Sequence, residues 1–124
     1  MLDIRFWLIL KKRLLMTSFR LKSRQWIVDE NNKIIIGEGR KAILENIEKT
    51  GSINKAAKVM KMSYKGVWSK IKATESSMNL KLVDTDRKRG SHLTEAGKDL
   101  LKKYDDLKKR CLKADDRIFN AIFK

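Results

Sequence analysis

Hydroxyl, aromatic and cationic side chains gather in residues 63–72, which read SYKGVWSKIK. From Ile53 to Lys72 the chain carries six lysines and no acidic residue. Ammonium groups neutralise phosphates, while phenol and hydroxyl groups donate hydrogen bonds to phosphate oxygens or base edges. This segment therefore indicates contact with a nucleic acid rather than covalent chemistry.

Residues suited to catalysis or metal binding are few and far apart. The chain has one cysteine, Cys111, and one histidine, His92, which gives no metal-ligand spacing. It contains no Gly-rich phosphate loop and no Ser/His/Asp pattern. We therefore expect no enzyme activity and no cofactor. We interpret Cys111 and His92 as structural residues rather than as a redox switch and a pH sensor.

Composition points to the same partner class. The 124 residues allow one domain with an extension, and the formal net charge of +15 makes nucleic acid the leading partner. Proline is absent, which favours long uninterrupted helices. A single cysteine excludes an internal disulfide and fits a reducing cytoplasm.

Three consecutive helices are predicted around the basic segment. Apolar residues at helical spacing indicate the first, from about Gly39 to Lys49, and Gly51 ends it. A second helix over Ile53–Met60 and a third from Ser63 to about Ser77 follow, each beginning at a serine cap. This is the pattern of a helix-turn-helix, whose second helix enters the major groove of DNA.

The third of these helices is the expected recognition helix. Val67 and Ile71 follow the spacing of a core face. Gly66 is unusual within a helix, because glycine lowers helix propensity by about 1 kcal/mol relative to alanine. The side chains expected to approach DNA from this helix are Ser63, Tyr64, Lys65, Ser69 and Lys70.

Two β-hairpins are expected to flank the helices. The first spans Gln25–Ile36. The second has a strand over Leu80–Asp84, a basic turn over Asp86–Ser91 and a return strand that begins at His92-Leu93. A helix-turn-helix followed by such a hairpin is a winged helix. The wing and flanking residues expected to contact DNA are Ser52, Lys55, Arg87, Lys88 and Arg89.

A long carboxyl-terminal helix is predicted from Thr94 onward. Its apolar residues alternate in steps of four and three, which is a heptad seam. The seam suggests a dimer, and the alternative is that the helix packs on its own domain. The seam residues are Leu100, Tyr104, Leu107, Cys111, Ala114, Ile118 and Ala121. The expected architecture is mainly α with small β (α+β), divided into an extension (1–24), a winged helix (25–93) and this helix (94–124).

The amino-terminal stretch MLDIRFWLILKKRLLM is apolar and basic, but its apolar run Phe6–Leu10 is too short to span a membrane. Three interpretations stay open. It forms a short amphipathic helix that packs on the domain or on a second subunit, or it lies on a membrane surface. Alternatively, translation begins at Met16 and residues 1–15 do not belong to the native protein.

The run from Gly37 to Lys72 resembles the amino-terminal DNA-binding domain of the ModE family of molybdate-responsive transcription regulators, and more distantly the LysR-type winged helix. The resemblance covers about Trp26 to Tyr104. The motifs that carry it are Gly37-x-Gly39-Arg40, Gly51-Ser52-Ile53, Ala56-Ala57, Ser63-Tyr64-Lys65 with Trp68, and Leu93-Thr94-x-x-Gly97.

This resemblance implies a cytoplasmic, homodimeric protein that binds a palindromic operator in double-stranded DNA. Ser63, Tyr64 and Lys65 would approach DNA, while Trp68 would anchor the recognition helix to the core. Family members that sense molybdate carry further carboxyl-terminal domains that bind the oxyanion. This chain ends at Lys124, so we expect no direct molybdate binding.

Three functions remain as hypotheses. The first is a sequence-specific transcription regulator. The second is a non-specific nucleic-acid or chromosome-organising protein driven by the charge of +15. The third is a protein-interaction module in which the terminal helix pairs with a partner. The combination of a recognition helix with a wing favours the first. The operator, the regulated genes and any effector do not follow from the sequence.

Overall fold

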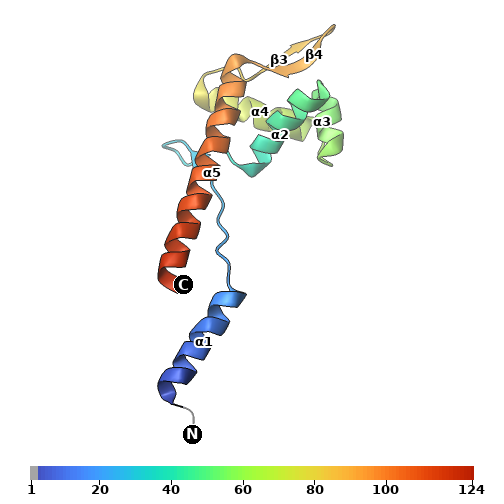
Figure 1. Cartoon of the computed structure of the whole chain (residues 1–124). Helices are drawn as coiled ribbons and strands as arrows, with labels where there is room; N and C mark the ends of the chain where they lie inside the picture. The colour runs from blue at the N-terminus through green and yellow to red at the C-terminus, as the bar shows by residue number, and fades with distance from the viewer. Residues whose placement is uncertain (1–2) are drawn as a thin grey trace. The chain divides into compact units, whose positions relative to one another are not determined.

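The computed structural model describes residues 3–124, apart from the side chains of residues 12–18. Helices dominate, with two small hairpins between them, and this confirms the expected winged helix followed by a long helix (Figure 1). The elements in chain order are α1 (Ile4–Ser18), β1 (Ile27–Val28), β2 (Ile34–Ile36), α2 (Glu38–Thr50), α3 (Ile53–Val59), α4 (Tyr64–Met78), β3 (Val83–Asp86), β4 (Gly90–Leu93) and α5 (Glu95–Phe123).

Local signals in the sequence set the helix boundaries. Gly51 ends α2 in the left-handed conformation with φ of 72°, and its N–H donates to the Ile47 carbonyl. The Ser52 hydroxyl accepts from the Lys55 N–H at 3.1 Å and so caps α3. The Ser63 hydroxyl caps α4 by accepting from the Gly66 N–H at 3.0 Å. The three helices therefore begin and end within a residue or two of the expected positions.

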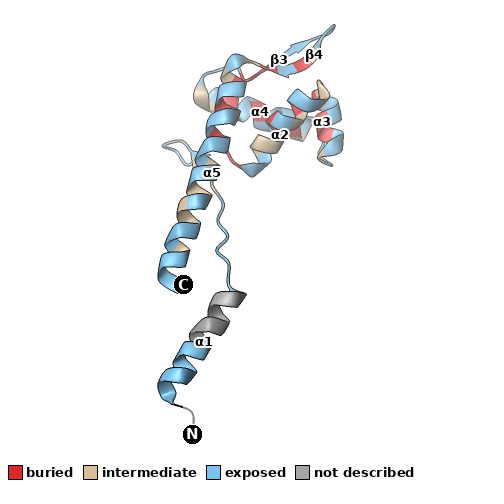
Figure 2. Ribbon diagram, viewed as in Figure 1, coloured by how far each residue is buried: buried red, intermediate tan, exposed pale blue. Residues whose placement is uncertain are grey.

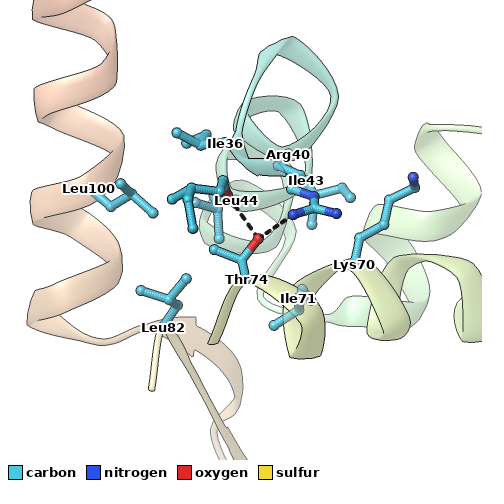
Figure 3. A pocket seen from close by; sticks show the side chains of 10 residues that line it. Ile36, Arg40, Ile43, Leu44, Lys70, Ile71, Thr74, Leu82 and Leu100 are labelled. Carbon is cyan, nitrogen blue, oxygen red and sulfur yellow. Dashed lines mark hydrogen bonds between the residues drawn. The ribbon is translucent and has the colours of Figure 1, made fainter. Parts of the chain in front are cut away.

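One apolar core joins α2, α3, α4, the wing and the first part of α5, and Figure 2 shows its buried residues on the facing sides of these elements. Figure 3 shows side chains from α2, α4 and α5 meeting in this core. Small Ala56 and Ala57 let α3 pack closely. The other buried apolar residues are Ile36, Ile43, Leu44, Ile47, Ile53, Val67, Ile71, Leu82, Val83, Leu93, Leu100 and Tyr104.

The wing is shifted along the chain from its predicted position. β3 pairs antiparallel with β4 from Val83 opposite Leu93 to Asp86 opposite Gly90, so the prediction of a strand over Leu80–Asp84 was wrong in its limits. The Glu75 carboxylate accepts from the N–H groups of Leu82 at 2.7 Å and Val83 at 3.2 Å. A side chain from α4 therefore takes the donors that a longer strand would use.

The wing is also tied to the end of α2. The Ser91 N–H donates to the Gly51 carbonyl at 2.8 Å. Gly90 has φ of 77°, and a Cβ there would lie 2.3 Å from that same carbonyl oxygen. Only glycine fits this approach. The return strand consequently begins at Gly90 rather than at His92, and the turn is reduced to Arg87–Arg89.

The chain divides into two compact units. Residues 24–108 form the winged-helix unit, and residues 1–23 with 109–124 form the second unit, here called the terminal unit. In the terminal unit, α1 exposes its apolar side chains from Ile4 to Leu10. No helix among the described residues is long and apolar enough to cross a membrane. The alternative start at Met16 concerns a residue whose side chain lies outside the described part.

Candidate nucleic-acid interface

The amino-terminal half of α4 has one buried side and one exposed side. Val67 and Ile71 face the core, whereas Lys65 and Ser69 are exposed on the opposite side of the helix. Tyr64 is half exposed at the first position of α4. Three of the five side chains predicted to approach DNA from this helix, those of Tyr64, Lys65 and Ser69, are thus exposed in its first two turns.

Ser63 and Gly66 act together at the start of α4. The Ser63 hydroxyl accepts from the Gly66 N–H, so it already serves as the helix cap. A Cβ at Gly66 would lie only 3.0 Å from that hydroxyl oxygen. Glycine at this position therefore leaves room for the Ser63 cap, and this explains locally why a glycine occurs within the helix.

Trp68 does not anchor α4 to the core as predicted. Its side chain is 44% exposed, and the Lys72 ammonium lies 5.5 Å from the ring centroid. Because each helical residue turns by about 100°, Trp68 lies beside the core face rather than on it. Val67 and Ile71 occupy the buried positions instead. Trp68 and Lys72 thus belong to the exposed surface of α4.

Lys72 connects this surface to the wing. Its ammonium group lies 3.2 Å from one Glu75 carboxylate oxygen, while the other oxygen accepts the two backbone N–H groups at the base of the wing. The charge of Glu75 is therefore balanced within the fold. The sequence did not predict this arrangement, because a glutamate within a helix usually lies in solvent.

Four of the five predicted wing and flanking residues are exposed, and Ser52 is the exception. Arg87, Lys88 and Arg89 are exposed in the turn between β3 and β4, and the Lys88 N–H donates to the Asp86 carboxylate at 2.9 Å. Lys55 is exposed in the first turn of α3. Ser52 is half buried, and its hydroxyl accepts the hydrogen bond that caps that helix.

Lys70 is the predicted DNA residue that lies apart from the others. It is exposed, but it lies near Arg40 of α2 at the side of α4 (Figure 3). The Arg40 guanidinium donates to the Ile34 carbonyl and, at 2.8 Å, to the Thr74 hydroxyl. Burial lowers the pKa of Arg40. These bonds hold the β1–β2 hairpin and α4 against the start of α2.

The predicted heptad seam of α5 divides into two environments. Leu100 and Tyr104 are buried in the core of the winged-helix unit. Leu107, Ile118 and Ala121 are exposed, whereas Cys111 and Ala114 are partly buried.

Polar contacts fix the first part of α5. The Tyr104 hydroxyl donates to the Gln25 carbonyl at 2.6 Å and lies 3.1 Å from the Glu38 carboxylate. Burial and the contact with Glu38 raise the pKa of Tyr104 to about 12. Ion pairs join Lys108 to Glu38 at 2.6 Å and Lys41 to Asp105 at 2.9 Å. Residues 95–108 thus belong to the winged-helix unit.

The described part of the chain offers no candidate metal site. There, no group of three or more His, Cys, Asp or Glu side chains is placed to hold a metal ion. The features that remain for function are the exposed cationic and aromatic side chains of α4 and the wing.

Comparisons with known proteins agree with this geometry. Residues 41–98 match the family model described as bacterial regulatory helix-turn-helix protein, lysR family. The molybdenum transport protein ModE of Azotobacter vinelandii is 30% identical over 111 residues, covering 86% of this chain and 41% of that protein. ModE of Herbaspirillum seropedicae is 36% identical over 75 residues, covering 57% of this chain and 28% of that protein. The matched part of the chain thus spans less than half the length of these relatives.

Solved structures share the fold. The DNA-binding domain of CbnR in complex with DNA superposes with a TM-score of 0.55 at 21% identity, covering 68% of this chain and 95% of that chain. CbnR itself, a LysR family transcriptional regulator, superposes with a TM-score of 0.52 at 22% identity, covering 64% of this chain and 27% of that chain.

Proposed function

We propose that this ModE-like chain, whose residues 41–98 form a LysR-type winged helix-turn-helix, is a sequence-specific transcription regulator that binds DNA in the cytoplasm. The observation that carries the proposal is the exposed side of α4, which presents Lys65 and Ser69, together with Tyr64, which is exposed at the start of the helix. The wing adds three further cationic side chains.

The shape and chemistry of α4 suit a major groove. An α-helix with its side chains is about 10–12 Å wide, and the major groove of B-DNA is about 12 Å wide. Lys65 supplies a flexible point charge for phosphate, while the hydroxyls of Tyr64 and Ser69 can hydrogen-bond to phosphates or base edges. The wing residues Arg87–Arg89 would then lie along the backbone or in the minor groove.

We further propose that the protein binds as a homodimer to a palindromic operator. Leu107 and Ile118 expose apolar side chains along one seam of α5, and a second copy of the helix would cover them. Two-fold symmetry would place the recognition helices in half-sites about one helical turn apart.

The test is binding to duplex DNA at several salt concentrations. Three duplexes are compared: the region upstream of the chain's own gene, a promoter of molybdate transport genes, and a scrambled duplex of equal length. The second is chosen because the relatives are named molybdenum transport proteins. We expect a preference of about a thousandfold for one natural duplex. Lys65→Gln should weaken binding and reduce the salt slope by about 0.9. Lys113→Gln, in the terminal unit, is the matched control.

Equal and steeply salt-dependent binding to every duplex would contradict sequence specificity. It would favour a non-specific nucleic-acid coat, for which the net charge of +15 is the supporting observation. A footprint without two-fold symmetry would contradict the palindromic operator while leaving DNA binding intact.

A further inference from the structure

A cavity of about 330 Å³ lies in the winged-helix unit, between the β1–β2 hairpin, the start of α2 and α4. This volume is at the lower end of the range for pockets that hold small molecules, about 300–1,000 Å³. Its lining includes the motif Gly37-x-Gly39-Arg40, which the proposed DNA contacts do not use. Of the predicted DNA residues, only Lys70 lines it.

The cavity combines positive charge with apolar walls. Arg24, Arg40 and Lys70 line it, and Arg40 is held in place by its bonds to Ile34 and Thr74. Trp26, whose side chain is 61% exposed, contributes a flat aromatic surface. Further apolar lining comes from Ile34, Ile43 and Met62.

The acidic residue in this lining does not cancel the positive charge. Glu38 lines the cavity, but its carboxylate lies 2.6 Å from the Lys108 ammonium and 3.1 Å from the Tyr104 hydroxyl. Its charge is therefore balanced from α5. The cations of the lining remain in excess, which favours an anionic ligand.

The two glycines of the motif differ in what they permit. A Cβ at Gly37 would lie 3.1 Å from the Trp26 Cβ, so this glycine allows the tryptophan to approach. A Cβ at Gly39 would meet nothing within 4 Å, and its φ is not in the left-handed range. Neither packing nor backbone conformation requires glycine there. A side chain at residue 39 would instead take up open space in the cavity wall.

We propose that this cavity binds a small aromatic anion, in which a flat apolar body packs on Trp26 and a carboxylate or phosphate group meets Arg24, Arg40 and Lys70. The site extends beyond the proposed DNA-binding function, because the free protein would bind the ligand. Met62 precedes α4 and Lys70 belongs to it, so the ligand would contact the recognition helix directly. A bound ligand should therefore change DNA affinity, and DNA should change ligand affinity by the same factor.

The test is isothermal titration of the full chain, without DNA, with phenyl phosphate and with benzoate. Neutral benzyl alcohol and inorganic phosphate report the separate contributions of the ring and the charge. We expect one saturable site for at least one aromatic anion, with affinity at least tenfold above both single-feature probes. The better of the two anions identifies the acidic group as phosphate or carboxylate.

Variants locate the site. Gly39→Leu should lower the affinity at least tenfold, and Lys70→Gln should lower it several-fold. Lys58→Gln removes an exposed lysine of α3 outside the cavity and should bind as the unchanged chain does. Thermal unfolding checks that each variant is folded. The proposal is overturned if no aromatic anion saturates, if Gly39→Leu binds equally well, or if benzyl alcohol binds as tightly. Promoter binding, measured separately, is unaffected by such a failure.

Discussion

The two parts of α5 carry the same alternation of three- and four-residue steps but lie in opposite environments. In residues 95–108, Tyr104 is fully buried and polar contacts join the helix to α2. In residues 109–124, Ile118 is 55% exposed. A heptad pattern therefore identifies the apolar side of a helix, but it does not identify the surface that covers that side.

This difference separates stability that comes from contacts within one chain from stability that comes from contacts between two copies. The contacts of Leu100, Tyr104 and Lys108 are made within one chain, so their contribution to the free energy of unfolding should not depend on protein concentration. If a second copy covers residues 109–124, as we propose, their contribution should grow with concentration. Substitutions on either side of residue 108 can test this distinction.

The largest effect is expected at Tyr104. Tyr104→Ala removes a fully buried aromatic ring and should lower the free energy of unfolding by about 3–5 kcal/mol. Urea unfolding at two protein concentrations should give the same loss. Lys102→Ala, at an exposed position of the same part of α5 that lies off the seam, is the control. A small or concentration-dependent effect of Tyr104→Ala would place this residue on the intermolecular side and break the comparison.

Glu75 should give the next largest effect. Its buried carboxylate accepts from two backbone N–H groups at the base of the wing. Glu75→Ala leaves these donors without that partner and should cost about 2–3 kcal/mol, since hydrogen bonds to charged groups contribute about 1.5–3 kcal/mol. Hydrogen exchange of the Leu82 and Val83 amides should accelerate. Glu45→Ala, at an exposed position of α2, is the control, and unchanged exchange would contradict the assigned role.

Ile118 tests the other side of the comparison. Ile118→Asp places a charge on the exposed seam and should raise the dimer dissociation constant at least tenfold, about 1.4 kcal/mol. The monomer should remain folded, because Ile118 lies outside the core of the winged-helix unit. Sedimentation equilibrium measures the constant, with Lys113→Gln as the control. A chain that stays monomeric at every concentration, or a variant that pairs as before, rules out this seam.

Local signals in the sequence predicted the helices and the wing because short-range contacts determine them. Ser52, Ser63 and Gly51 set helix ends through bonds to residues no more than four positions away. The limits of β3 depend on Glu75, a buried side chain of α4 that accepts hydrogen bonds at the base of the wing. A local sequence pattern does not predict a contact between two separate elements. The sequence therefore predicted the wing correctly, but it placed the limits of its strands wrongly.

The candidate site shows the same division. Exposed residues of α4 could be identified from helical spacing, because Val67 and Ile71 define the buried side. The anchoring role of Trp68 was implied by the family resemblance and was wrong, because its helical position lies beside the buried side. The cavity at Gly39 was missed for a different reason. Its lining residues come from four segments of the chain, so only the folded structure brings them together.

The smallest expected effect concerns pH, at the contact where the buried part of α5 ends. The hydrogen bond from Lys108 lowers the pKa of Glu38 below its ordinary value of 4.5, although burial opposes this shift. A lowered carboxylate pKa stabilises the fold above about pH 4.5, and this stabilisation is lost as pH falls through the folded-state value. Because the Glu38 side chain is 45% exposed, solvent screening should keep the effect below about 1 kcal/mol.

Glu38→Gln should therefore flatten the dependence of unfolding free energy on pH below about 4.5. Lys108→Gln should flatten it to a similar extent, and the double variant should add little, since both substitutions break the same contact. Urea unfolding between pH 3 and pH 6 provides the measurement, at two protein concentrations. Equal curves at both concentrations would assign this ion pair to the intramolecular part of α5. A concentration-dependent curve would instead mean that the boundary between the two parts lies before Lys108.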